Sequence, residues 1–438
     1  MLRALLTAFL FFLINACTEQ KKPVDNFNLL AENYVRLGLT IGQYDPDFVD
    51  AYYGPDSLKP PGRKGTSFPK DSLLAAVNNL QAQCNKYTDS SGANDTLRLR
   101  ATWMSRQLAA FAERIRIFSG TFSSFDEESK QLFSVAPPAY TEDHFKVLVG
   151  KLDSILPGKG PIPARMQALS RNFIIPKEKV DTVFKVAIEE ARKRTREHYQ
   201  MPSNESFVLE YVNNKPWSGY NWYKGNYQSI IQINLDLPIL IDRAIDLACH
   251  EGYPGHHVYN MLLEKNLYRD KGWVEISLYP LYSPQSLIAE GSANYGIEMA
   301  FPGSEGSAFA RKSLVPLAGL DTAQVELYFQ TLSLKSQLNY ARNEAARGLL
   351  NGSMDEKESL RWLTDYALMS NELAAKSISF IRKHRSYVIC YNYGLDLVRN
   401  YIESRGGTAG SPAKRWELFG WLLSNPVTPV DLSTSGNL

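Results

Sequence analysis

Apolar residues recur every three to four positions through the first half of the chain, from about residue 26 to 200. This spacing gathers them on one face of a helix, which is typical of helices that pack on a core. Examples are Leu73, Val77 and Leu80 and, further along, Phe145, Leu148, Leu152 and Ile155. We predict that residues 26–200 form a helical lobe that packs against the region that follows.

The pattern changes near residue 205. Two short runs rich in β-branched and aromatic residues, 207–212 and 229–234, are flanked by Asn, Gly and Pro, which is typical of strands. Pro238 then opens a helical pattern that leads into His250, and beyond Pro284 helical spacing continues almost to Trp421. The predicted fold is mainly α with a small β-sheet, and residues 201–438 form the second region.

The first 16 residues predict a signal peptide. One Arg is followed by a run of about a dozen apolar residues, which suits a signal peptide, whereas a membrane span needs about 20. The stretch Ile14-Asn15-Ala16-Cys17 resembles the lipobox of bacterial lipoproteins, in which the Cys becomes the lipid-modified first residue. We expect a lipid anchor at Cys17 and a tether over residues 17–25. An ordinary cleaved signal with an incidental cysteine is the alternative.

The lipobox resemblance also implies a location. Thr18 rather than Asp follows the cysteine, and by the lipoprotein rule this argues against retention in the inner membrane. We therefore expect an outer-membrane lipoprotein of the bacterial cell envelope that faces the periplasm or the cell surface.

The charge and the cysteine content argue against two classes of protein, nucleic-acid-binding proteins and disulfide-stabilised scaffolds. The chain has 48 Lys and Arg against 46 Asp and Glu, and these charges are mixed rather than collected into a basic stripe. We therefore expect no nucleic-acid partner. The three remaining cysteines, Cys84, Cys249 and Cys390, are too few and too scattered for a disulfide scaffold.

The histidines carry the strongest chemical signal. The chain has six, and three of them fall in residues 250–257, which read HEGYPGHH. Neutral imidazoles are the usual zinc ligands, and a carboxylate directly after the first His suits a base that meets metal-activated water. We predict Zn²⁺ bound by His250 and His256, with Glu251 as the general base. His257 remains the alternative ligand to His256. The alternative to a metal site is a group of surface histidines that bind no metal.

This spacing requires a break in the helix. The common zinc-peptidase motif places two His four residues apart on one helical face, and this chain does not. On an unbroken helix neither His256 nor His257 would reach a metal held by His250. Pro254 cannot donate a helical hydrogen bond and Gly255 tolerates unusual backbone angles, so we predict that the helix deforms there.

A third ligand is expected from a later helix. Glu290, in the stretch Ile288-Ala289-Glu290-Gly291, is the best candidate. Asn294 follows one helical turn later and could orient a ligand through a hydrogen bond. A solvated helix carboxylate is the alternative for Glu290.

HEGYPGHH followed by an EG-x-A helix resembles the bacterial domain-of-unknown-function family 885. That family is similar to gluzincin metallopeptidases, alongside carboxypeptidase Taq and the thimet-type oligopeptidases. The early stretch 47–55, DFVDAYYGP, is also similar to relatives, and the resemblance is concentrated in residues 245–300 and 380–402. It implies a gluzincin-like architecture and a zinc-dependent peptidase that cleaves peptide substrates outside the cytoplasm. By analogy, the strand over 230–234 would align the substrate as an added strand.

The resemblance has departures. Residues 345–350 read AARGLL where relatives carry an Asp and a His around a Gly, so a polar group that could steady the transition state is missing. The late tyrosine of the family is present as Tyr391, which the resemblance implies as an oxyanion donor, with Tyr387 and Tyr393 as alternatives. Two other functions therefore stay open, a non-peptidase zinc hydrolase and a metal-binding lipoprotein with reduced catalysis.

Overall fold

The computed structural model describes residues 26–62, 65–89, 94–215 and 217–433. The predicted signal peptide, the tether and Cys17 lie outside these residues. Within them, no helix is both long enough and apolar enough to cross a membrane.

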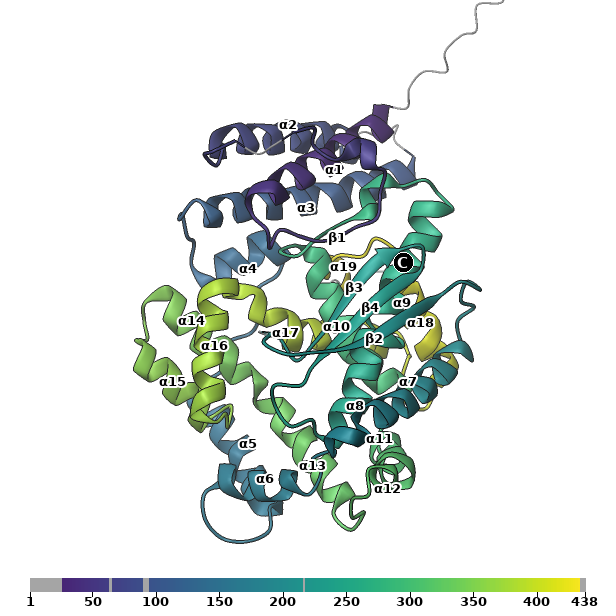
Figure 1. Ribbon diagram of the computed structural model, residues 1–438. Helices are drawn as coiled ribbons and strands as arrows, with labels where there is room; N and C mark the ends of the chain where they lie inside the picture. The colour runs from purple at the N-terminus through teal and green to yellow at the C-terminus, as the bar shows by residue number, and fades with distance from the viewer. Residues whose placement is uncertain (1–25, 63–64, 90–93, 216, 434–438) are drawn as a thin grey trace, which may run out of the picture.

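Long helices form the first part of the chain (Figure 1). They are α1 (Asn26–Tyr44), α2 (Lys70–Thr88), α3 (Asp95–Phe118), α4 (Phe125–Phe133), α5 (Glu142–Ile155), α6 (Ile162–Arg171) and α7 (Val180–Arg196). The apolar positions that predicted these helices face the core, since Leu73, Val77 and Leu80 of α2 and Phe145, Leu148 and Leu152 of α5 are buried. The first turns of α3 and α4 are capped by the side chains of Asn94 and Ser124.

A three-stranded sheet follows α7. It contains β2 (Ser206–Val212), β3 (Gly219–Gly225) and β4 (Gln228–Asn234), in the order β2-β4-β3. β2 runs parallel to β4, and β3 runs antiparallel to it. The sequence predicted β2 and β4 but not β3, whose glycine ends and alternating polar residues weaken the strand signal.

The position of β4 corrects one expectation. β4 is the middle strand, hydrogen-bonded on both sides, so it cannot accept a substrate as an added strand. The edges of this sheet are β2 and β3. A peptide that extended the sheet would have to pair with one of them.

A second, smaller pairing crosses the predicted boundary between the two regions. β1 (Val49–Tyr52) lies in the first region and pairs antiparallel with β5 (Leu278–Pro280) in the second. The first region is therefore helical with one short strand. The division at residue 200 remains a prediction.

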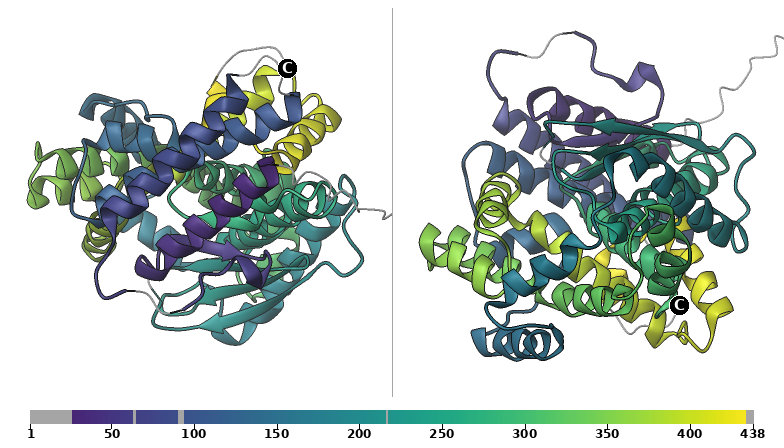
Figure 2. Two further views of the ribbon diagram at one scale, coloured as in Figure 1. Left: turned by 90° about the horizontal axis from the view of Figure 1, so that it is seen from above. Right: turned by 60° about the horizontal axis from the view of Figure 1, so that its bottom comes forward.

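Helices complete the second region. After α8 (Ile241–Leu247) and α9 (His256–Leu263) come α10 (Pro284–Ala300), α11 (Glu305–Phe309), α12 (Val315–Leu317), α13 (Val325–Ser336), α14 (Tyr340–Asn351), α15 (Glu356–Asp365), α16 (Asn371–His384), α17 (Ile389–Ser404), α18 (Pro412–Ser424) and α19 (Pro429–Ser433). Figure 2 shows the three-stranded sheet on one side of the molecule and the C-terminal helices on the opposite side. The fold-class prediction, mainly α with a small β-sheet, is confirmed.

Candidate metal centre

The helix that carries His250 deforms as the sequence predicted. α8 begins at Ile241, three residues later than Pro238 suggested, and continues as a π-helix from Ala248 to Gly252. The amide of Tyr253 donates to the carbonyl of Ala248 at 2.9 Å, and α9 starts afresh at His256. The wider turn and the break bring His256 back towards His250, which a regular helix would not do.

Gly255 is required at this break because the backbone packs against itself. Its amide donates to the carbonyl of Cys249 at 2.9 Å. A Cβ atom at this position would collide with the carbonyl oxygens of Cys249 and His250. Only glycine fits this approach, so residue 255 fixes the geometry that joins the two histidines.

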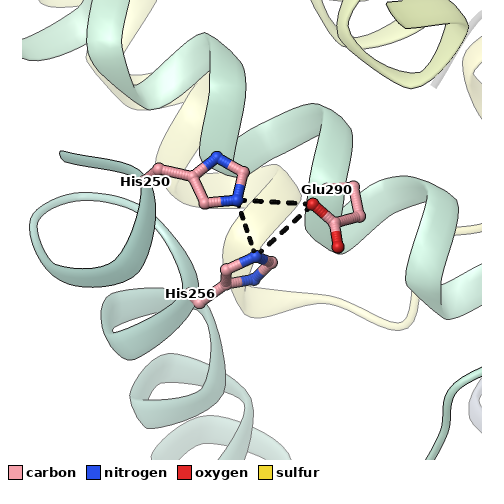
Figure 3. A group of neighbouring side chains, drawn as sticks. All are labelled: His250, His256 and Glu290. Atoms are coloured by element: carbon pink, nitrogen blue, oxygen red, sulfur yellow. Dashed lines mark hydrogen bonds and ion pairs between the residues drawn. The ribbon is translucent and has the colours of Figure 1, made fainter. Parts of the chain in front are cut away.

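Three side chains point at one another (Figure 3). The Nε2 atoms of His250 and His256 lie 3.2 Å apart. Glu290 Oε2 lies 3.4 Å from the first of these nitrogens and 3.6 Å from the second. The three residues that the sequence singled out as ligands are therefore brought together, and they form a group that could hold a metal ion.

The donor set fits a zinc ion. A tetrahedral ion with bonds of about 2.0–2.1 Å separates its ligand atoms by about 3.3 Å, close to the three distances observed. Glu290 Oε2 is buried and has no hydrogen-bond partner among the described residues. A buried carboxylate oxygen without a partner is costly, and a cation between it and the two imidazoles would remove that cost.

The electrostatics of the three side chains agree with this arrangement. Burial alone lowers the pKa of His250, but the carboxylates of Glu290 and Glu251 offset this effect, and the net shift is upward. Burial raises the pKa of Glu290, and the two histidines more than reverse it, so the net shift is downward. Each group stabilises the charged form of the other, as expected where ligands of opposite character converge.

Asn294 orients His250 as predicted. Its Oδ1 atom lies 2.9 Å from Nδ1 of His250, and its Nδ2 atom donates to the backbone carbonyl of Tyr391 at 2.8 Å. Because the amide oxygen accepts, Nδ1 of His250 carries a proton, and in the neutral imidazole, the form that binds a metal, Nε2 is left with a free lone pair. Asn294 thus fixes the tautomer that a metal ligand needs.

His257 makes hydrogen bonds outside the ligand group. It is fully buried, with Nδ1 2.8 Å from Ser229 Oγ and Nε2 2.9 Å from Glu205 Oε1. Both ring nitrogens therefore have partners that tie α9 to β4 and to the start of β2. Among the two neighbouring histidines, only His256 faces His250 and Glu290.

Glu251 lies beside the ligand group without joining it. Its side chain is buried, and a Cβ atom on Gly219, at the start of β3, would lie 3.2 Å from its Oε1 atom. Its backbone carbonyl accepts from Nδ2 of Asn221 at 2.7 Å, which ties the π-helix to β3. The carboxylate thus lies against an edge strand of the sheet, near enough to His250 to raise the pKa of that imidazole.

The three candidate tyrosines, Tyr387, Tyr391 and Tyr393, differ in their relation to Glu290. The hydroxyl of Tyr387 donates to Glu290 Oε1 at 2.9 Å, so this residue orients the carboxylate. The ring of Tyr391 lies 5.8 Å from that of Tyr387. Burial raises the pKa of Tyr391 and the charge of Glu290 raises it further, which keeps its proton in place. The charges that affect Tyr393 are those of Asp396 and Tyr140 rather than Glu290.

Sequence reasoning missed a pair of residues near the ligands. The hydroxyl of Tyr220, on β3, donates to the carboxylate of Asp50, on β1. Burial raises the pKa of Asp50 to about 6, against the opposing effect of this hydrogen bond and of His256. Asp50 belongs to the DFVDAYYGP stretch, which was the only available signal that this early segment reaches the site.

Asp246 does not support His250. It pairs instead with Arg243, three residues earlier on the same helix. Cys84, Cys249 and Cys390 are buried and form no disulfide with one another, consistent with the prediction that the chain has no disulfide scaffold.

No model of a known protein family matches the chain, and no curated protein matches it either. Among solved structures, it is similar to "the putative lipoprotein from Colwellia psychrerythraea", with a TM-score of 0.54 and 15% identity. That match covers 84% of this chain and 66% of the Colwellia chain. At this identity the likeness shows a shared fold.

Two other solved structures match with lower TM-scores. One is a carboxypeptidase from Pyrococcus furiosus, with a TM-score of 0.47 and 12% identity, covering 94% of this chain and 95% of that chain. The other is a putative lipoprotein of unknown function from Shewanella oneidensis, with a TM-score of 0.45 and 13% identity, covering 83% and 71%. The fold and the site together define a mainly helical protein with a His-His-Glu group that could hold a metal ion.

Proposed function

We propose that this protein is a zinc-dependent hydrolase, and that its substrates are peptides. The observation that carries the proposal is the convergence of two imidazole nitrogens and one buried carboxylate oxygen, which makes no hydrogen bond among the described residues, within 3.2–3.6 Å of one another. Three protein ligands leave a fourth position open, which is typical of catalytic rather than structural zinc sites. The side chains of His250 and His256 are each 13% exposed, so solvent reaches part of the two histidine side chains.

His250, His256 and Glu290 would hold the ion. When bound, zinc polarises a carbonyl oxygen and makes water acidic near neutral pH. Glu251 would accept a proton as water adds to the scissile carbonyl carbon, and would deliver that proton to the amine nitrogen as the C–N bond breaks. The hydroxyl of Tyr391 would donate a hydrogen bond to the carbonyl oxygen as that atom gains negative charge.

The resemblance to family 885 supports the choice of a peptide over another substrate. HEGYPGHH, the EG-x-A helix and Tyr391 are the residues that carry it, and all of them lie in or beside the site. We propose on this basis that the chain is a gluzincin-like member of that family. The missing polar residue in 345–350 is the feature that favours the second candidate, a metal-binding protein with reduced catalysis.

A paired measurement tests the function. We expect purified protein to hold about one zinc ion per chain by elemental analysis and to cleave members of a peptide library followed by mass spectrometry. The zinc-depleted protein should lose cleavage and regain it on addition of zinc. Protein that holds zinc but cleaves no peptide would contradict the peptidase, and ester or non-peptide amide substrates would then identify another hydrolase.

We further propose that the mature protein is anchored by lipid at Cys17. The lipobox-like stretch before that residue supports this location. Cells that express the wild-type chain and are grown with a labelled fatty acid should yield labelled protein, and Cys17→Ser should yield none. Equal labelling of both proteins would rule out Cys17 as the attachment site, and label in neither would favour an ordinary cleaved signal.

A further inference from the structure

A buried carboxylate of the first region contacts the segment that leads to the candidate metal centre. Glu128, on α4, is fully buried. Its Oε2 atom accepts from Nε of Arg385 at 2.5 Å, and its Oε1 atom accepts from the backbone amide and the hydroxyl of Ser386 at 3.1 and 2.7 Å. Both carboxylate oxygens therefore accept hydrogen bonds from the two consecutive residues that directly follow α16.

The backbone at this point is strained. Arg385 has a φ of +54° and a ψ of −124°, a conformation that residues with a Cβ atom rarely adopt. A residue in such a conformation persists only where its surroundings hold it in place. The three hydrogen bonds from Arg385 and Ser386 to Glu128 hold Arg385 in this conformation. The Arg385 guanidinium also lies 4.3 Å from the ring centroid of Phe122.

Tyr387 follows within the same short turn. The 3₁₀ helix η8 (Arg385–Val388) places its hydroxyl 2.9 Å from Glu290 Oε1. The ring of Tyr387 packs 6.1 Å from that of Phe133, at the other end of α4. Helix α4 thus binds the first two residues of η8 through Glu128, and it contacts the ring of Tyr387 through Phe133.

We infer that Glu128 is a positioning residue for the metal centre, acting through Arg385 and Ser386 on Tyr387, and through Tyr387 on the Glu290 carboxylate. This inference rests on the proposed zinc site. With Oε1 of Glu290 held by Tyr387, Oε2 is the oxygen presented to His250 and His256. If the turn relaxes, that carboxylate is free to rotate away from the imidazoles.

Zinc affinity of the full-length protein, measured by competition with a chromophoric chelator, tests the inference. Glu128→Gln keeps the size of the side chain and one acceptor for Ser386 but removes the charge that pairs with Arg385. Residues that orient metal ligands contribute about 10–100-fold to affinity, and we expect a loss in this range. Tyr387→Phe should cause a loss of similar size, because it removes the hydrogen bond to Glu290.

Glu275→Gln is the matched control. Glu275 is also buried and accepts from Arg100 at 2.6 and 2.8 Å, but it belongs to η5 (Val274–Ser277), which makes no hydrogen bond to the three ligands within the described residues. Its loss should lower thermal stability and leave zinc affinity unchanged. An equal loss of affinity in Glu275→Gln would mean that general destabilisation, and not positioning, explains the Glu128 result.

The double variant decides whether Glu128 acts through Tyr387. Once Tyr387→Phe has removed the hydrogen bond, adding Glu128→Gln should weaken zinc binding no further. Losses that multiply would overturn the inference while leaving the zinc site intact, as would unchanged affinity in Glu128→Gln alone. Wild-type protein that binds no zinc would instead refute the proposed function, and this inference with it.

Discussion

Replacing Glu251 with Gln should leave zinc content unchanged and lower the rate of peptide hydrolysis by about 10²–10⁴-fold, the usual contribution of a positioned acid or base. The carboxylate lies next to Gly219 and is not one of the three converging ligands. Gln preserves size and the hydrogen bond that the backbone carbonyl receives from Asn221, but it cannot accept a proton from water. The change should therefore appear in kcat, with zinc content and folding preserved.

Glu210→Gln is a suitable control for that experiment. Glu210 is a half-buried carboxylate on β2 that accepts from Gln232 of β4 at 2.8 Å. Its replacement should leave the rate of hydrolysis unchanged. Loss of zinc in Glu251→Gln would make this residue a ligand instead of a base, and retained activity would leave the proposed mechanism without its proton acceptor.

Replacing His250 with Ala should abolish stoichiometric zinc and all zinc-dependent hydrolysis. His250 supplies one of three converging atoms, and the two that remain cannot close a site around the ion. Zinc at about 100 times its Kd should stabilise the wild-type protein by about 2.7 kcal/mol, because it binds the folded state alone. We expect thermal unfolding of His250→Ala to show no such response to zinc.

The neighbouring histidines provide the matched pair. His256→Ala should behave as His250→Ala does, since its Nε2 atom faces the same point. His257→Gln should keep its zinc and instead lose about 1–3 kcal/mol of stability, because buried partners of His257 are left without hydrogen bonds. Zinc retained in His256→Ala and lost in His257→Gln would reverse the ligand assignment.

The geometry of the site also explains why some residues were predictable and others were not. His250, Glu251 and His256 were visible because ligand types cluster within one short stretch, and Pro254 with Gly255 marked where the helix had to break. Glu290 was chosen for its residue type and for its place on a predicted later helix. The three-dimensional structure brings it to 3.4 Å from His250.

The choice between His256 and His257 depended on contacts distant in sequence. Adjacent residues on a helix point about 100° apart, but the sequence does not say which direction faces the core. Ser229 and Glu205, which lie 28 and 52 residues before His257, take up both of its ring nitrogens. That leaves His256 for the site.

The sequence by itself determined the helical class, two of the three strands of the sheet, and the residue types of the candidate site, because periodicity and clustering are local properties of the chain. Tertiary structure alone decided that β4 is a central strand, that Tyr387 rather than Tyr391 contacts Glu290, and that Glu128 supports that tyrosine. Tyr387 and Glu290 are 97 residues apart, and Glu128 and Ser386 are 258 apart. Such pairs form only when packing of the whole core fixes both partners, and no local pattern encodes that packing.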